Sequence, residues 1–185
     1  LSPHTRVEVL RPHDAHTLSL QDAQGNRVLL AASPWSDVLK SLQSRQYSRL
    51  HIHHLHGYPQ AVTELPQALG LPTDITLHDF AAYCPQYSLS TADGRYCGEP
   101  DLDGCERCVQ ERPHAWGLTV SASRDRHHHL LTQAERILVP SNFVENRFKA
   151  HWPELNAGIT MSFKSPPELI GAKQSCALFF TSSSS

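Results

Sequence analysis

The sequence contains no apolar run of the ~18–20 residues that a helix needs to cross a bilayer, and no basic-then-apolar leader pattern at its start. It also has little net charge, −2 at pH 7, and no block of Lys and Arg longer than two residues. These absences argue against a membrane span and against an electrostatic surface for nucleic acid. Apolar residues make up 39% and charged residues 18%, which excludes collagen-like, coiled-coil and strongly disordered chains. We therefore expect a globular protein.

Hydrophobic patterning predicts strands in the first half of the chain and again near residue 136. Two alternating stretches, 17–20 and 27–30, flank a turn-forming segment, which is typical of a β-hairpin. Residues 49–55, 74–78 and 136–139 each combine apolar and β-favouring residues and end at a turn or loop signal. We expect strands at all of these positions.

Helices are predicted between these strands. One begins after Pro34, and a second is expected over residues 116–134. A third is expected from Asn142, because Glu145 three positions later completes a capping signature. The alternation of strands and helices predicts an α/β fold, with a Rossmann-like parallel sheet flanked by helices and an N-terminal β-hairpin.

We expect residues 1–167 to form one Rossmann-like domain that contains a Cys-rich irregular insert at 81–113. The Ser-rich end predicts an irregular or disordered tail over 168–185. The chain begins at Leu1, close to a predicted strand, so we expect it to be part of a longer protein whose first strand precedes it.

Four of the five cysteines fall within 25 residues, with the spacing C-x12-C-x7-C-x2-C: Cys84, Cys97, Cys105 and Cys108. A Cys-x-x-Cys hook on a reverse turn can place two sulfurs on one ion, and zinc accepts four thiolates in a tetrahedral shell. The loop around them is too short to bury a core, so a crosslink would hold it together. The sequence favours a structural Zn²⁺ bound by these four residues, with two disulfides or free thiols as alternatives.

Four histidines occupy one short segment: His51, His53, His54 and His56. The pattern is superficially similar to the His-x-His-x-Asp-His motif of metallo-β-lactamase-like hydrolases, but its Asp is missing, and Asp79 is the only acidic residue near another strand end. One hypothesis is therefore a metal-dependent hydrolase. The favoured interpretation is that the first two cover a sheet face, while His54 and His56 reach a cleft beside Gly57.

His78 ends a predicted buried strand and is followed at once by Asp79; we expect both to be catalytic, with Asp79 orienting His78 or capping the following turn. In parallel α/β sheets, ligands gather beyond the carboxyl ends of the strands. A neutral imidazole at that place can hydrogen-bond to a sugar hydroxyl or a phosphate. Ser141 and Asn142 follow another strand and can offer backbone N–H groups to the same cleft, or can simply cap a helix.

Six segments in order carry a resemblance to a known family: 50–57, 74–80, 84–85, 93–100, the Cys-x-x-Cys hook at 105–108, and 135–141. Together they resemble the acceptor-side half of bacterial GT-B glycosyltransferases of the family 4 kind. The match covers residues 7–160. The Gly-rich loop that follows the family's first strand, and the Glu-x7-Glu pair of its donor half, are not in this sequence.

The resemblance implies one half of a two-domain enzyme that transfers a sugar with retained anomeric configuration and without a divalent metal in the reaction. It implies that His78 lies near the transferred sugar, that a C-terminal donor-binding domain holds the nucleotide-sugar, and that this chain alone is inactive. The implied acceptor is a glycan or lipid-linked glycan of the cell envelope, met in the cytoplasm or at the inner face of the membrane. A non-catalytic zinc-stabilised binding module is a further alternative.

Overall fold

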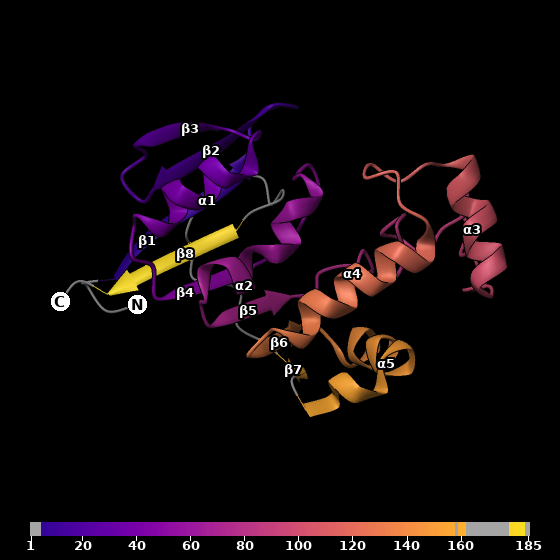
Figure 1. The fold of residues 1–185 in the computed structure, drawn as a ribbon. Helices are drawn as coiled ribbons and strands as arrows, with labels where there is room; N and C mark the ends of the chain where they lie inside the picture. The colour runs from indigo at the N-terminus through magenta and orange to yellow at the C-terminus, as the bar shows by residue number, and fades with distance from the viewer. Residues whose placement is uncertain (1–4, 158, 162–177, 184–185) are drawn as a thin grey trace.

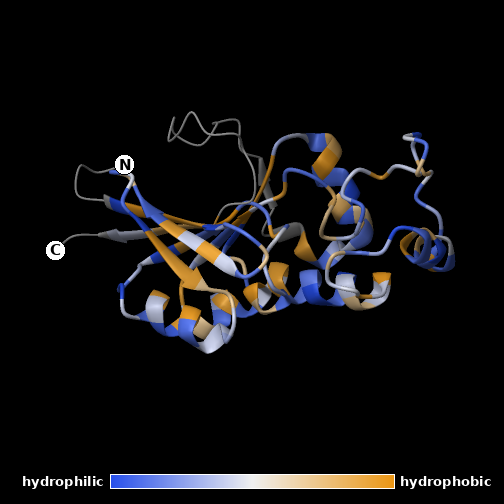
Figure 2. Cartoon of the chain, turned by 90° about the horizontal axis from the view of Figure 1, so that it is seen from above, coloured by the Kyte–Doolittle hydropathy of each residue, from blue (hydrophilic) through white to orange (hydrophobic). Residues whose placement is uncertain are grey.

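The computed structural model describes residues 5–157, 159–161 and 178–183 (Figure 1). They form the expected α/β fold, in which hydrophobic residues are concentrated on the strands (Figure 2). The strands are β1 (Thr5–Pro12), β2 (Thr17–Asp22), β3 (Arg27–Ala31), β4 (Arg49–Ile52), β5 (Thr73–Thr76), β6 (Arg136–Val139), β7 (Ile159–Met161) and β8 (Leu178–Ser183). The α-helices are α1 (Trp35–Gln43), α2 (Leu65–Leu69), α3 (Leu102–Glu111), α4 (Val120–Thr132) and α5 (Asn142–His151), and two 3₁₀ turns cover Gln60–Glu64 and Pro153–Ala157.

The described strands make one mixed sheet in the order β3-β2-β1-β8-β4-β5-β6-β7. Strands β4, β5, β6 and β7 pair in parallel, as the alternation of strands and helices predicts. The other half is antiparallel, because β1, β2 and β3 follow one another through short turns and β8 pairs antiparallel with both β1 and β4. The predicted parallel pairing is therefore confirmed only for the half of the sheet that contains β4 to β7.

Strand β8 corrects the prediction of an irregular tail. It lies between β1 and β4, and the side chains of Leu178 and Phe180 are fully buried. Its Ser-rich end pairs too, since Ser182 lies opposite Arg6 on β1. Ladder hydrogen bonds come from the main chain, so a low-complexity side-chain pattern does not prevent pairing. The remaining part of the expected tail that precedes β8 lies outside the described residues.

The N-terminal hairpin is confirmed. Strands β2 and β3 pair with Leu18 opposite Leu30, and Asp22 closes the turn by accepting hydrogen bonds from the backbone N–H groups of Gln24 and Asn26. Strand β3 is a mostly exposed edge strand of the sheet. Helix α3 lies at the opposite end of the molecule (Figure 1).

The helices match the predicted pattern with corrections at their ends. Helix α1 follows Pro34, as expected. Helix α4 begins only at Val120, because Thr119 caps it by accepting from the N–H of Ala122. The predicted cap of α5, Asn142, is instead its first residue: Ser141 is the N-cap, and its Oγ accepts from the Val144 N–H at 3.4 Å.

The insert at 81–113 is not irregular throughout, because it contains α3. Asp101 caps this helix by accepting from the Gly104 N–H at 2.9 Å. Cys105 and Cys108 therefore lie on a helix, and the prediction of a reverse-turn hook is wrong. An Asp followed by a segment with helix-forming Leu, Glu, Arg and Gln is enough to form a helix once the cap is satisfied.

A buried carboxylate fixes the amino ends of the parallel strands. Asp74 on β5 receives hydrogen bonds from Arg49 on β4 and Arg136 on β6, both at 2.9 Å to Oδ1. Burial raises the pKa of Asp74, but the hydrogen bond and charge of Arg136 and the charge of Arg49 outweigh it and hold the pKa below its ordinary value. The ionised Asp74 thus sets the relative register of three strands, and with it the positions of their carboxyl ends.

Candidate functional site at the strand ends

Three pairs of polar side chains bridge the carboxyl ends of β4 and β5. His51 Nε2 lies 2.7 Å from Thr76 Oγ1, His53 Nδ1 lies 2.7 Å from His78 Nε2, and His54 Nε2 lies 2.7 Å from Asp79 Oδ2. Each pair is separated by 25 residues along the chain. The constant separation follows from the parallel pairing of β4 with β5, so the strand register itself assembles the site.

The protons of the His54–Asp79 pair can be assigned from the contacts. His54 Nδ1 accepts the backbone N–H of His56 at 2.9 Å, so the neutral ring carries its proton on Nε2 and donates it to Asp79. Burial alone would raise the pKa of Asp79. The hydrogen bonds from His54 and from the Ala81 N–H have a larger, opposite effect, so the pKa lies below its ordinary value. Asp79 is thus an ionised carboxylate that orients His54 and caps the turn after β5.

This assignment bears on the hydrolase hypothesis. Both ring nitrogens of His54 are engaged by protein groups, which leaves no lone pair of the neutral ring for a metal ion. His56 uses its Nδ1 on the hydroxyl of Tyr87 at 2.7 Å. Within the described residues, no group of three or more His, Cys, Asp or Glu side chains is placed to hold one metal ion.

The imidazoles of His51, His53 and His78 form a row of uncharged rings. The His51 and His53 centroids are 4.3 Å apart, and those of His53 and His78 are 4.9 Å apart. Burial lowers the pKa of His51 to about 4, although Asp74 opposes the shift, and burial together with the two neighbouring histidines lowers the pKa of His53 to about 3. The pKa of His78 is lowered by burial as well. All three rings are therefore neutral near pH 7.

His78 is nevertheless an exposed residue, two positions beyond the end of β5 at Thr76, so a ligand can reach its ring. Its Nε2 is engaged by His53, and its Nδ1 has no bonding partner within the described part of the chain. The adjoining α5 reaches the same region, because Phe143 in its first turn contacts Phe80 edge to face at 6.3 Å. Ser141 uses its side chain to cap α5, which confirms the capping alternative for this residue, and Asn142 is exposed beside it.

His54, His56 and Gly57 line a hollow of about 20 Å³ at this edge of the sheet. That space suits about one water molecule and is too small for a sugar ring. Gly57 has a φ of +81°, and a Cβ there would lie 3.1 Å from Pro12 Cγ, so the turn favours glycine for steric reasons. The hollow is closed by residues that the sequence did not single out: Leu55, Ala81, Tyr87, His114, Ala115, Trp116 and His127.

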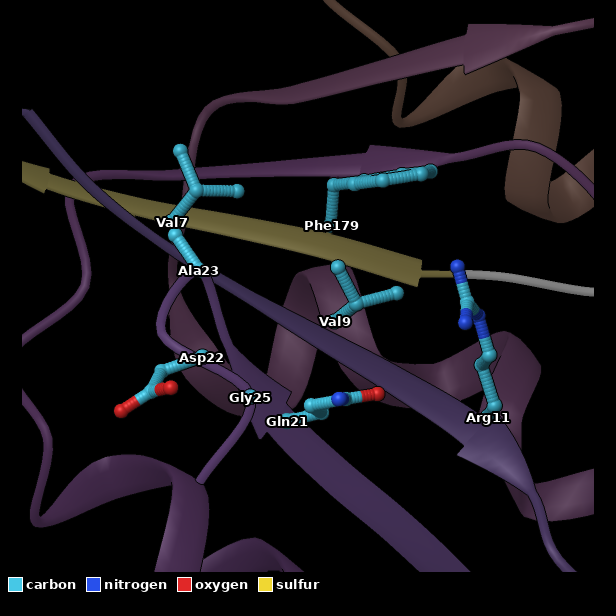
Figure 3. Close-up of a pocket in the computed structure, with 8 residues that line it drawn as sticks. All are labelled: Val7, Val9, Arg11, Gln21, Asp22, Ala23, Gly25 and Phe179. Atoms are coloured by element: carbon cyan, nitrogen blue, oxygen red, sulfur yellow. The ribbon is translucent and has the colours of Figure 1, made fainter. Parts of the chain in front are cut away.

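A larger cavity of about 140 Å³ lies beside β1, β2 and β8, on the antiparallel half of the sheet (Figure 3). Val7, Val9 and Phe179 point into it together in Figure 3. Phe179 also meets His53 edge to face at 4.9 Å between ring centroids. No sequence pattern indicated this contact, because β8 and β4 become neighbours only in the folded sheet.

The four cysteines lie outside the strand-end cluster and carry free thiols, all of them half-buried: Cys84, Cys97, Cys105 and Cys108. None of the four forms a disulfide in the structure. Burial raises the pKa of Cys84, and the nearby Cys97 and Cys105 act in the same direction. The four thiols therefore lie near one another. In the described part of the chain, however, no three of them are placed so that they could hold one metal ion.

Comparison with known proteins yields no relative: no family model matches the chain, and neither the curated proteins nor the solved structures contain a match. In the part of the chain that the structure describes, no helix has the length and apolar character needed to span a bilayer.

Proposed function

We propose that this chain is the acceptor-side part of a retaining glycosyltransferase, with His78 at the reaction site. The observation that carries the proposal is the His53–His78 pair, which holds an exposed, uncharged imidazole at the carboxyl end of a parallel strand. Both residues of this pair lie in the segments of the sequence that resemble family 4 glycosyltransferases.

The pair gives His78 a definite role whichever tautomer it adopts. If His53 donates to His78, the other nitrogen of His78 carries a proton that can be donated to a sugar oxygen. If His78 Nε2 instead donates to His53, the Nδ1 of His78 has a lone pair, which can accept a hydrogen bond from a sugar hydroxyl. In both cases the ring stays neutral and is held in one orientation, which is what a group that positions a substrate hydroxyl requires.

The surroundings suit a reaction in which a nucleoside diphosphate departs and an acceptor hydroxyl takes its place on the anomeric carbon. The N-terminus of α5 lies at the end of β6, where backbone N–H groups and the helix dipole favour negative charge. Asp79 remains turned toward His54 and acts as a positioning residue. In this proposal a donor-binding domain supplies the nucleotide-sugar, and a glycan or lipid-linked acceptor of the cell envelope approaches at the cytoplasmic side.

The decisive experiment uses the complete gene product with a panel of nucleotide-sugars and follows release of nucleoside diphosphate and the anomeric configuration of the product by NMR. His78→Ala is expected to lower transfer by about 10²-fold or more, the usual scale for a positioned catalytic group. His129→Ala, an exposed histidine on α4, serves as the matched control and should leave the rate unchanged. A His78→Ala protein with near-normal transfer would remove this residue from the site, and a complete gene product without a donor half would contradict the proposed enzyme class.

A further inference from the structure

Two arginines connect α3, which carries Cys105 and Cys108, with the loops that carry Cys84 and Cys97. Arg124 on α4 donates from Nε to the carbonyl of Tyr83 at 2.9 Å and from Nη2 to the Sγ of Cys105 at 3.5 Å. Tyr83 immediately precedes Cys84 in the chain. A single guanidinium thus connects α3 with the segment that bears Cys84.

Arg112, directly after α3, makes the equivalent connection on the other side. Its Nη2 donates to the carbonyl of Ser90 at 2.6 Å and to the Sγ of Cys108 at 2.9 Å. Ser90 forms a β-bridge with Tyr96, the residue before Cys97. The second guanidinium therefore connects α3 with the turn that bears Cys97.

These two guanidinium groups have an unusual charge environment. Within the described residues, neither Arg112 nor Arg124 is paired with a carboxylate, and both contacts with sulfur are partly buried. A nearby anion offsets the desolvation of a partly buried cation, and each of these guanidinium groups instead faces one thiol and one backbone carbonyl. Neutral thiols satisfy hydrogen bonds weakly and supply no countercharge.

We propose that Cys84, Cys97, Cys105 and Cys108 bind one Zn²⁺ as a tetrathiolate centre, with Arg112 and Arg124 as its counterions. Binding replaces four S–H bonds by four Zn–S bonds and releases four protons to solvent, without oxidation or reduction. One Zn²⁺ with four thiolates retains two negative charges. The two guanidinium groups match that charge and donate N–H bonds to two of the sulfurs.

The helix contributes half of the ligand set in a favourable arrangement. Cys105 and Cys108 are three positions apart on α3, which places them on the same helical face. Among the described residues these side chains are not placed to hold one ion, so metal binding requires the cysteine side chains to rearrange. The arginine contacts hold both loops against α3 and its C-terminal end.

The test begins with the full 185-residue chain, purified under reducing conditions and gel-filtered, followed by elemental analysis and a Co²⁺ titration. We expect about one tightly bound Zn²⁺ per chain and a Co²⁺ spectrum with tetrahedral d–d bands and thiolate charge-transfer absorption for four sulfurs. This spectrum needs no substitution, so it is independent of any folding defect. Absence of both signals, or a thiol count showing two disulfides, would overturn the metal centre.

Substitutions then test the ligands and the counterions separately. Cys105→Ser should abolish tight binding, whereas Cys176→Ser, outside the cluster, should retain it. Arg112→Gln and Arg124→Gln should each weaken Zn²⁺ affinity by about 10–100-fold, the scale found for groups that support metal ligands. Arg107→Gln, an exposed residue of the same helix, should have no effect.

Lysine variants separate charge from shape, because Arg124 also holds a backbone carbonyl and its loss can disturb folding. Arg112→Lys and Arg124→Lys keep the positive charge and should recover most of the lost affinity. Lysine variants as weak as the glutamine variants, or glutamine variants that bind as tightly as the unsubstituted chain, would overturn the counterion role. None of these outcomes depends on glycosyl transfer.

Discussion

The strand-end histidines and the cysteine segment bring distant residues together by different means. His53 meets His78, and His54 meets Asp79, because β4 and β5 pair in parallel. Cys105 and Cys108 are connected to their neighbours through the side chains of two arginines. The histidine cluster therefore depends on backbone register. The cysteine cluster depends on side-chain contacts and, in our proposal, on the Zn²⁺ that the cysteines bind.

The substitution Asp74→Asn tests whether the histidine cluster depends on strand register, and it has the largest expected effect. This change leaves Arg49 and Arg136 without their carboxylate at the amino ends of the strands, and we expect it to lower the free energy of unfolding by about 3 kcal/mol. Urea unfolding followed by circular dichroism measures the loss. Asp37→Asn, whose ion pair with Lys40 is exposed, is the control and should change stability little. Equal effects of the two substitutions would contradict the register role of Asp74.

The second prediction concerns acid. The pKa values of His51 and His53 in the folded protein, about 4 and about 3, lie below the 6.5 of the unfolded chain. As the pH falls below about 6.5, the unfolded state binds protons that the folded state does not, so stability decreases, by up to about 1.4 kcal/mol per pH unit for each ring. The loss ends once the pH falls below the folded pKa values.

Urea unfolding between about pH 7.5 and 5 measures this slope above the range in which Asp74 and Asp79 titrate. His53→Gln should reduce the slope by the share of one ring, up to about 1.4 kcal/mol per pH unit, while the other histidines whose pKa is lowered, His51 and His78 among them, keep the rest. His13→Gln, which replaces an exposed histidine between β1 and β2, serves as the control for this slope. A slope that is the same in all three proteins would show that the row of rings is not what makes the protein acid-sensitive.

The smallest expected effect tests whether α3, which carries Cys105 and Cys108, is energetically independent of the strands that hold the histidines. Asp101→Ala removes the N-cap of α3 and should destabilise that helix by about 1 kcal/mol. Hydrogen exchange should then quicken in α3 while the strands β4 and β5 keep their protection. Asp103→Ala, an exposed residue in the same turn, is the control. Faster exchange throughout the sheet would mean that the two regions are energetically coupled.

Much of the fold could be predicted from periodicity. The hairpin, α1 and the strands at β4, β5 and β6 lie where the patterns place them, although β4 ends at Ile52 rather than at residue 55 and β5 ends at Thr76 rather than at residue 78. Strand β8 was not predicted although segment 178–181 contains strand-favouring residues, because the run is short, leads into serines, and pairs with β1 and β4, which are remote in sequence. The sequence does not predict α3, because the turn-forming residues Asp103 and Gly104 lie in its first turn and indicate a loop; the cap at Asp101 outweighs them.

The candidate site was predictable at its centre and not at its edges. His78 and Asp79 follow a buried strand, and the carboxyl-end rule for parallel sheets is sufficient to select them. Tyr87, Trp116 and Phe179 carry no comparable signal, since each reaches the histidines from a loop or a strand whose position depends on the whole fold.

The amino-acid sequence by itself determined which residues bear chemistry and which of them end strands, because both follow from local residue type and period. Tertiary structure alone decided that His53 holds His78, that Asp79 holds His54 and that two arginines face the cysteine thiols. The reason is physical: a side chain acquires its pKa, its tautomer and its counterion from neighbours that only the packed sheet and helices bring within a few ångströms.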